Sequence, residues 1–236
     1  MSNSYFKFKQ FTIEQELCAM KVGTDGCLLG AWFDTNSCSR ILDVGAGTGL
    51  ISLMAAQRST AQITGIEIEK DAAKQAVENV KKSPWSNRVE IICEDFTKFS
   101  TPYPFEAIVS NPPFFTNSLK CSSDKKTLAR HNDTLSPEKF FKKSKELLAA
   151  NGKISIVIPT DLLSEWQSEG LKAGFSAQRA AFIHTTPKKS AKRVLIEFSS
   201  KACSLPLTED IILETSPGTY SERVCELLRD FYLKID

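Results

Sequence analysis

The sequence contains the stretch Ile41-Leu42-Asp43-Val44-Gly45-Ala46-Gly47-Thr48-Gly49, in which an apolar run leads into three closely spaced glycines. The apolar run predicts a buried strand, and the spacing of apolar residues over 49–57 predicts a helix directly after it. A tight turn from strand to helix needs residues that tolerate positive φ and that let a ligand approach the backbone. Gly45, Gly47 and Gly49 are therefore predicted to form a binding loop, with a purely structural turn as the alternative.

The spacing of the glycines indicates which ligand the loop binds. A dinucleotide-binding loop has the pattern Gly-x-Gly-x-x-Gly, whereas Leu50 occupies the position of its third glycine here. Asp43, two residues before the first glycine, would repel a pyrophosphate because like charges repel. The sequence also lacks a P-loop motif. S-adenosylmethionine carries a sulfonium, an ammonium and ribose hydroxyls but no phosphate, so the loop favours it as the cofactor.

From residue 40 onward, short apolar runs alternate with helix-length amphipathic segments, as is typical of βαβ units on a parallel sheet. Strands are predicted at 41–44, 63–68, 89–93, 107–109 and 154–158, and helices at 49–57, 70–82, 137–150, 161–173 and 221–234. Ser136 and Thr160 are the predicted N-caps of two of these helices. Residues 175–185 and 193–199 predict two strands without a helix between them, hence an antiparallel pair joined by an exposed loop.

The overall composition is that of one globular domain of 236 residues, with 42% hydrophobic and 25% charged residues. We divide this domain into an extension (1–39), a core (40–200) and a carboxy-terminal segment (201–236). Two histidines and seven scattered cysteines without Cys-x-x-Cys predict neither a metal site nor a disulfide framework. The lack of a long apolar run or an apolar leader predicts a cytosolic protein without a membrane segment.

Basic residues are concentrated in the middle of the chain. Residues 111–200 carry 15 basic and 8 acidic side chains, whereas residues 1–110 carry 11 and 13, and residues 201–236 carry 4 and 7. Such a block is either a solvated face or a surface for a polyanion.

Acidic residues follow the second and third predicted strands. Glu67 ends the second strand, where an acid accepts both ribose hydroxyls in nucleotide-binding βαβ folds; its neighbour Glu69 is the alternative for that role. After the third strand, Asp95 is predicted to accept from the adenine amino group, and Phe96 to pack on the ring. A helix cap is the alternative role for Asp95.

The fourth strand ends in Ser110-Asn111-Pro112-Pro113-Phe114-Phe115, at the sheet edge where ligands bind in open α/β folds. Methylation of an exocyclic amine makes its nitrogen positive. The side-chain carbonyl of Asn111 and the backbone carbonyl of Pro112 can accept the two N–H bonds and stabilise that charge. Phe114 offers a face for a planar base. These three residues form the predicted catalytic group, with a Pro-Pro turn beside core phenylalanines as the alternative.

With both motifs, the chain resembles the class I S-adenosylmethionine-dependent methyltransferases that modify amino groups. Further segments resemble the bacterial tRNA(Val) adenine-N6 methyltransferases, which act on adenosine 37 beside the anticodon. These segments are 8–11, 18–26, 28–32, 83–85, 129–130, 193–195 and 231–233. The resemblance therefore spans nearly the whole chain. One departure is Phe114, where tyrosine is common in relatives; both side chains stack on a base.

The resemblance implies an α/β fold with a doubly wound, Rossmann-like sheet of seven strands, the last of them antiparallel. It also implies a cytoplasmic monomer that uses S-adenosylmethionine, holds no metal and methylates N6 of one adenosine in the anticodon stem-loop of tRNA. The basic residues then gain a role as tRNA contacts: Lys21, Lys125, Lys126, Arg130, Lys188 and Lys189. Lys21 has a second candidate role, in covering the cofactor or shaping its loop.

Two alternatives stay open. The Asn-Pro-Pro-aromatic motif also occurs in RNA guanine-N2 and protein-glutamine N5 methyltransferases, so either reaction is the alternative activity. A non-catalytic nucleic-acid-binding protein could also have this fold, although such a protein has no need of Asp43, Glu67, Asp95 and Asn111 together.

Overall fold

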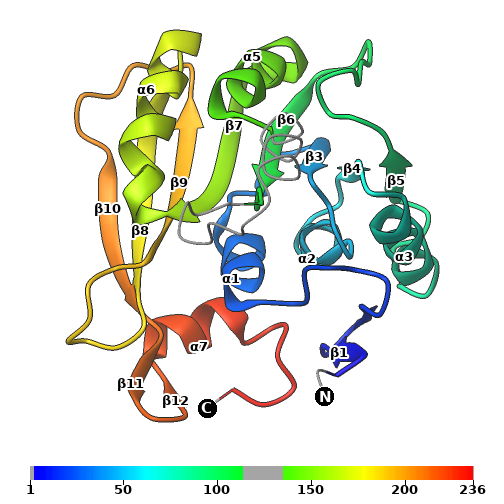
Figure 1. Cartoon of the computed structure of the whole chain (residues 1–236), viewed down its shortest axis with the longest axis vertical. Coiled ribbons are helices and arrows are strands. Elements are labelled where there is room, and N and C mark those ends of the chain that lie inside the picture. Colours follow the sequence, from blue (N-terminus) through cyan, green and yellow to red (C-terminus); the bar gives the residue numbers. More distant parts are fainter. Residues whose placement is uncertain (1–2, 114–134, 236) are drawn as a thin grey trace, which may run out of the picture.

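A computed structural model describes residues 3–113 and 135–235 of the chain (Figure 1). Phe114, Lys125, Lys126 and Arg130 lie outside these residues, so their predicted roles stay predictions. None of the helices in the described part combines the length and the hydrophobicity needed to cross a lipid bilayer.

The centre of the molecule is an eight-stranded sheet with the order β10-β8-β9-β7-β6-β3-β4-β5. Its strands are β3 (Arg40–Val44), β4 (Gln62–Glu67), β5 (Val89–Cys93), β6 (Phe105–Ser110), β7 (Leu148–Pro159), β8 (Ser176–His184), β9 (Arg193–Ser199) and β10 (Leu207–Ile212). Only β9 is antiparallel to its neighbours, β7 and β8. The predicted doubly wound sheet with its antiparallel final strand is confirmed, and β10 adds an eighth strand, parallel to β8, that the sequence pattern did not predict.

Helices cover both faces of this sheet. They are α1 (Thr24–Trp32), α2 (Leu50–Arg58), α3 (Lys70–Lys81), α5 (Pro137–Leu147), α6 (Leu163–Ala173) and α7 (Glu222–Leu228), with a 3-10 turn, η1 (Thr160–Leu162), before α6. Successive strand residues point to opposite faces. Ile41 accordingly belongs to the hydrophobic cluster under α1 and α2, and Leu42 to the cluster under α5 and α6. The result is a three-layer α/β/α arrangement.

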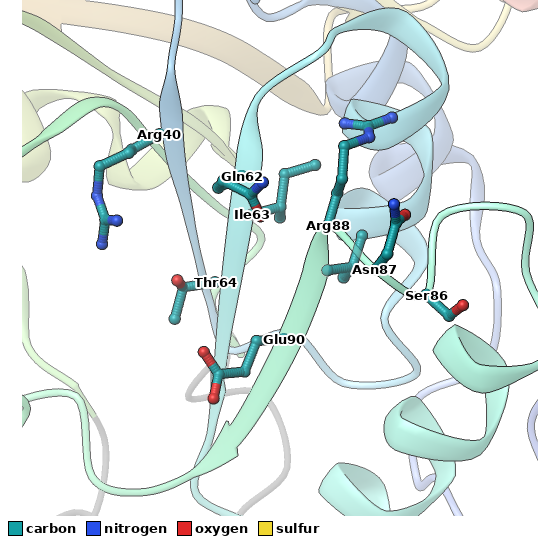
Figure 2. Close-up of a pocket in the computed structure, with 9 residues that line it drawn as sticks. Arg40, Gln62, Ile63, Thr64, Ser86, Asn87, Arg88 and Glu90 are labelled. Carbon is teal, nitrogen blue, oxygen red and sulfur yellow. The ribbon is translucent and has the colours of Figure 1, made fainter.

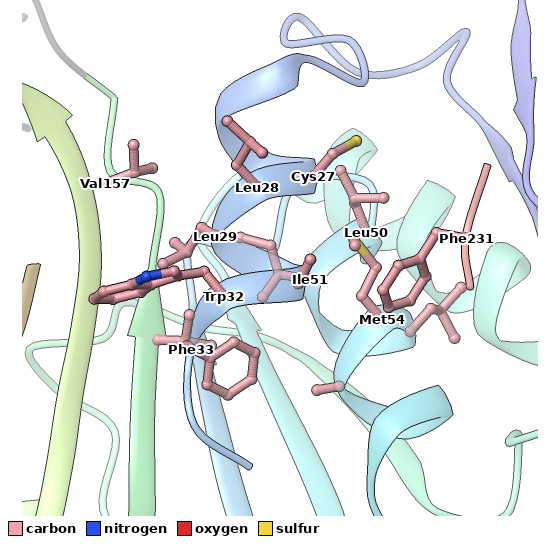
Figure 3. Close-up of a cluster of buried hydrophobic side chains, with 14 of the residues drawn as sticks. Cys27, Leu28, Leu29, Trp32, Phe33, Leu50, Ile51, Met54, Val157 and Phe231 are labelled. Carbon is pink, nitrogen blue, oxygen red and sulfur yellow. The ribbon is translucent and has the colours of Figure 1, made fainter. Parts of the chain in front are cut away.

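Helix α1 packs closely against α2. Leu28, Leu29 and Trp32 are buried among Ile51 and Met54 in the first cluster (Figure 3). Gly30 permits this approach, because a Cβ built on it would lie 2.6 Å from the sulfur of Met54. The amino-terminal extension is therefore an integral part of the core.

The two ends of the chain meet at one end of the molecule (Figure 1). A short hairpin, β1 (Tyr5–Lys7) with β2 (Thr12–Glu14), precedes α1, and a second one, β11 (Glu214–Ser216) with β12 (Thr219–Tyr220), precedes α7. Phe8 forms a β-bridge with Tyr232, and the Lys9 amide donates to the Phe231 carbonyl at 2.8 Å. The first and last segments thus stabilise each other.

Two predicted helix starts have different outcomes. Ser136 caps α5 as predicted, since its hydroxyl accepts from the Lys139 amide. The prediction for Thr160 was wrong: its hydroxyl donates to the Ala191 carbonyl at 3.0 Å, and residues 160–162 form the 3-10 turn. The predicted helix over 221–234 is shorter, ending at Leu228. In both cases a contact with a distant segment replaces continued local helical structure.

Candidate active site

Four parallel strands end side by side at the sheet edge that carries the glycine loop. Val44 of β3 pairs with Ser110 of β6 and with Ile66 of β4, and Glu67 of β4 pairs with Cys93 of β5. The predicted site residues follow or end these strands in the spatial order Asp95, Glu67, Gly45 and Asn111. Because neighbouring strands are about 4.8 Å apart, they lie along roughly 15 Å of one edge.

The glycine loop presents bare backbone to open space. Gly45, Gly47 and Gly49 have φ values of +73°, +55° and +80°, which residues other than glycine rarely adopt. A Cβ built on Gly45 would have no atom within 4 Å. The amides of Gly45 and Ala46 donate to the Ile66 carbonyl at 2.8 and 3.0 Å and so fix the loop on β4. This open backbone cradle fits a ligand that lies directly on the loop.

Glu67 ties the loop to the end of β4. Its side chain is buried, one carboxylate oxygen accepts from the Gly47 amide at 2.8 Å, and the other accepts from the Glu69 amide at 2.9 Å. The alternative acid, Glu69, is exposed and precedes the first turn of α3. Of the two acids, Glu67 is thus the one that contacts the glycine loop. Its predicted bond to a ribose remains a prediction.

Asp43 lies beneath the loop and is completely buried. One of its carboxylate oxygens accepts from the Ser52 hydroxyl of α2 at 2.7 Å. Within the described residues, the other oxygen has no hydrogen-bond partner. Burial raises the pKa of the Asp43 carboxyl to about 7, against the effect of the Ser52 hydrogen bonds, and the Glu67 carboxylate raises it further. An unpartnered carboxylate oxygen below a ligand cradle fits a cationic ligand.

Asp95 and Phe96 are both held by neighbouring residues. Asp95 accepts from the amide and the hydroxyl of Thr97 at 2.9 and 2.8 Å. Burial opposes its ionisation, but these hydrogen bonds and Lys98 lower the pKa of the carboxyl. Asp95 therefore stabilises a local turn. Phe96 is buried, with its ring 5.8 Å from that of Phe140. The predicted adenine contacts of both residues stay predictions.

Asn111 and Pro112 follow β6 directly beside the glycine loop. Ser110 is buried and its hydroxyl donates to the Val44 carbonyl at 2.8 Å, which fixes the end of β6 against β3. A Cβ built on Gly26 of α1 would lie 3.8 Å from the Asn111 side-chain nitrogen. The amino end of α1 therefore adjoins the acceptor motif.

Residues 14–22 of the extension lie against α3 and the glycine loop, and we call them the cover segment. Asn79 of α3 is completely buried; its amide nitrogen donates to the carbonyls of Glu14 and Thr48, and its oxygen accepts from the Glu14 amide, all at 2.9 Å. Burial and the nearby Glu67 carboxylate raise the pKa of the Cys18 thiol to about 11. The cover segment therefore reaches the edge of the predicted cofactor site.

Within this part of the site, sequence reasoning considered Lys21 but missed the residues that hold the cover segment in place. Neither Asn79 nor Gln15 belongs to a motif. Asn79 bonds to Glu14, which is more than 60 positions away in the sequence, and Gln15 accepts from the Val22 amide within an irregular segment. The only available signal was the pair of amide side chains, Gln75 and Asn79, on one side of an otherwise simple amphipathic helix. Gln75 accepts from the Leu17 amide at 3.4 Å.

The basic loop 185–192, between β8 and β9, lies at the same edge as the glycine loop. Arg193, which follows it, pairs with Pro159 at the carboxyl end of β7. Lys188 and Lys189 are exposed, as predicted. Arg193 donates to Asp25 at 2.8 Å, which connects the end of the loop to the amino end of α1. Lys21 is exposed, and its ammonium group donates to the Gln15 carbonyl within the cover segment.

One pocket of about 410 Å³ lies elsewhere (Figure 2). Its lining includes Arg40, Gln62 and Val89, which are the first residues of β3, β4 and β5, so it is at the opposite edge of the sheet from the glycine loop. It is therefore separate from the candidate active site.

In the described part of the chain, no group of three or more His, Cys, Asp or Glu residues is placed to hold a metal ion.

This fold, with a glycine loop and an Asn-Pro-Pro motif at adjacent strand ends, defines a class I S-adenosylmethionine-dependent methyltransferase. Residues 18–182 match the family model described as methyltransferase small domain. The tRNA1(Val) (adenine(37)-N6)-methyltransferase of Bacteroides fragilis is 44% identical over the full length of both chains. The chain belongs to the methyltransferase small domain family and, within it, to the family of the tRNA1(Val) (adenine(37)-N6)-methyltransferases.

Solved structures show the same fold at lower identity. A predicted O-methyltransferase from Agrobacterium tumefaciens has a TM-score of 0.69 and 21% identity, covering 90% of this chain and 99% of its own. A glycopeptide N-methyltransferase solved in complex with S-adenosyl-L-methionine has a TM-score of 0.54 and 13% identity, covering 77% and 90%.

Proposed function

We propose that this protein transfers the methyl group of S-adenosylmethionine to N6 of adenosine 37 in tRNA1(Val). The observation that carries the proposal is the position of Asn111-Pro112 beside the glycine loop, since Ser110 and Val44 pair in adjacent parallel strands. A methyl donor on the loop would therefore lie next to the group that receives the amine. The full-length relatives with this named activity support the choice of substrate.

The donor set fits S-adenosylmethionine. The open backbone at Gly45 and Gly47 admits a ligand, and the buried acids Asp43 and Glu67 favour a ligand with positive charge and hydroxyl groups. When bound, S-adenosylmethionine supplies a methyl group activated by its sulfonium. Glu67 would accept hydrogen bonds from the ribose hydroxyls, and Asp95 and Phe96 would contact the adenine. Gly49 has a structural role, because it lets α2 start close to α3.

Asn111 and Pro112 would receive the target amine. Their two carbonyl oxygens accept the N–H bonds of an exocyclic amino group and stabilise the positive charge that develops on its nitrogen. No strong base is required, because the proton is lost from an already cationic nitrogen. In this proposal Phe114, outside the described residues, stacks on the adenine ring.

The tRNA would lie across the edge formed by the strand ends. Lys188 and Lys189 in the exposed basic loop, Lys21 in the cover segment, and Lys125, Lys126 and Arg130 are the proposed contacts to phosphates around the anticodon stem-loop. The enzyme acts as a monomer in the cytoplasm without an obligate protein partner in this proposal.

The decisive experiment measures methyl transfer from labelled S-adenosylmethionine to unmodified total tRNA, followed by nucleoside analysis. Label in N6-methyladenosine, lost when adenosine 37 of a tRNA1(Val) transcript is replaced by guanosine, would establish the activity. Label in N2-methylguanosine, or in a protein glutamine with none in tRNA, would overturn the proposal in favour of the corresponding alternative.

A further inference from the structure

The single histidine in the described residues lies at the base of the basic loop. His184 ends β8, and residues 185–192 follow it. Its Nδ1 lies 2.8 Å from the Lys189 carbonyl oxygen, and its Nε2 lies 2.9 Å from a carboxylate oxygen of Asp210 on β10. The imidazole ring therefore connects the tip of the loop to the edge strand of the sheet.

Both ring nitrogens face groups that only accept hydrogen bonds. A carbonyl oxygen carries no proton, and the Asp210 carboxylate, whose side chain is 72% exposed, accepts hydrogen bonds but does not donate them. A neutral imidazole has one N–H and one lone pair, so either neutral tautomer would set a lone pair against an oxygen. Only the imidazolium can donate to Lys189 and Asp210 together.

We propose that His184, in its doubly protonated form, is the positioning residue that holds Lys188 and Lys189 of the basic loop in place for the tRNA. This inference rests on the proposed function. The His184 contact fixes the backbone of Lys189 near the tip of the loop. The base of the loop is held separately, because the Lys192 amide donates to the Ile183 carbonyl at 3.0 Å and the Ala191 carbonyl accepts from the Thr160 hydroxyl. Deprotonation leaves the ring a single N–H, so the ring loses one of its two hydrogen bonds and no longer ties Lys189 to Asp210.

Charged residues occur on each of the elements that adjoin His184. Asp210 on β10 contacts it, and Glu214 follows that strand; Lys188, Lys189 and Lys192 are in the loop, and Arg193 begins β9. The charge of Arg193 is paired with Asp25. The hydrogen bonds to Lys189 and Asp210 raise the pKa of His184 above its usual value, against the effect of burial. These hydrogen bonds therefore stabilise the imidazolium relative to the neutral ring, and tRNA binding should weaken as pH rises through this pKa.

The first test is ¹⁵N NMR of the histidine rings in the full-length protein. The chain has two histidines, so the His184→Gln variant assigns the signals. We expect protons on both nitrogens of His184 at pH 7, above the usual histidine pKa of about 6.5, and a lower titration midpoint in Asp210→Asn. A neutral ring at pH 7 would overturn the proposal.

The second test measures KM for tRNA1(Val) and for S-adenosylmethionine across the His184 titration. In wild type, KM for tRNA should rise about threefold to tenfold above the midpoint, the size expected for the net contribution of one hydrogen bond. KM for S-adenosylmethionine should not change across the same pH range. His184→Gln should show the high KM for tRNA at every pH, and His184→Arg, which stays charged and can donate twice, should show the low one.

The two proposals fail in different ways. If wild type labels tRNA but its KM for tRNA has the same pH dependence as that of His184→Gln, the role of His184 is refuted and the proposed function stands. If wild type does not label tRNA at any pH, the proposed function is refuted, and the role of His184 with it.

Discussion

At the scale of single residues, Asn111 carries the chemistry of the proposed reaction. Replacing it with alanine removes one of the two acceptors for the target amine but leaves the glycine loop intact. We expect kcat to fall about a hundredfold, the cost of one well-placed group that stabilises transition-state charge. S-adenosylmethionine binding, measured by calorimetry, should be retained. Undiminished turnover in Asn111→Ala would remove this side chain from the mechanism.

Asp43 couples stability to pH, also at the residue scale. Its pKa of about 7 is above the value of about 3.9 for an unfolded chain, so the folded state holds this proton more tightly. Stability contributed by the protonated form is therefore lost as pH rises from 4 to about 7. Asp43→Asn, which stays neutral, should gain stability relative to wild type across this range, by roughly 1.4 kcal/mol per pKa unit of elevation.

Denaturant unfolding of both proteins without cofactor, at pH 5 and pH 8, measures this difference. We also expect Asp43→Asn to bind S-adenosylmethionine more weakly, so that the variant is the more stable protein and the poorer enzyme. A stability difference that does not change with pH would contradict the burial of an ionising carboxyl at this position.

At the scale of elements, Asn79 is a buried side chain of α3 that joins the cover segment to the glycine loop. Asn79→Ala removes three hydrogen bonds that join Glu14 and Thr48 to this helix. We expect faster amide hydrogen exchange over residues 14–22 and a higher KM for S-adenosylmethionine. The protein should lose about 1–3 kcal/mol of stability, because the polar partners stay buried. Glu78→Ala, on the exposed side of the same helix, is the matched control and should change neither property.

The predictability of the elements follows the range of the interactions that form them. Strands β3 to β7 and the motifs at their ends could be predicted, because alternating buried strands and glycine turns are local patterns. Helix α1 could not, since seven of its nine residues are buried and it has no polar face to reveal a helical period. Strand β10 has only one fully buried residue, Ile211, and depends on pairing with β8. Thr160 bonds to a residue 31 positions away, which no local rule describes.

At the scale of the whole molecule, the distribution of basic residues predicts a salt-dependent encounter with tRNA. Lys188→Ala combined with Lys189→Ala should raise KM for tRNA and make it less sensitive to salt. The slope of log KM against log salt concentration should fall by about 0.7–0.9 for each phosphate that the variant no longer neutralises. Lys201→Ala is the control, because Lys201 is exposed beyond the opposite end of β9. Equal effects of the two changes on the salt slope would exclude a specific role for the basic loop.

The contact between Phe8 and Tyr232 has a consequence for synthesis on the ribosome. Phe8 can pair with Tyr232 only when the last segment has left the exit tunnel. Until then Phe8 and Phe11, both buried in the finished protein, lack part of their packing. A nascent chain arrested before residue 228 should therefore remain open to proteases near its amino terminus, and release of the complete chain should close that site.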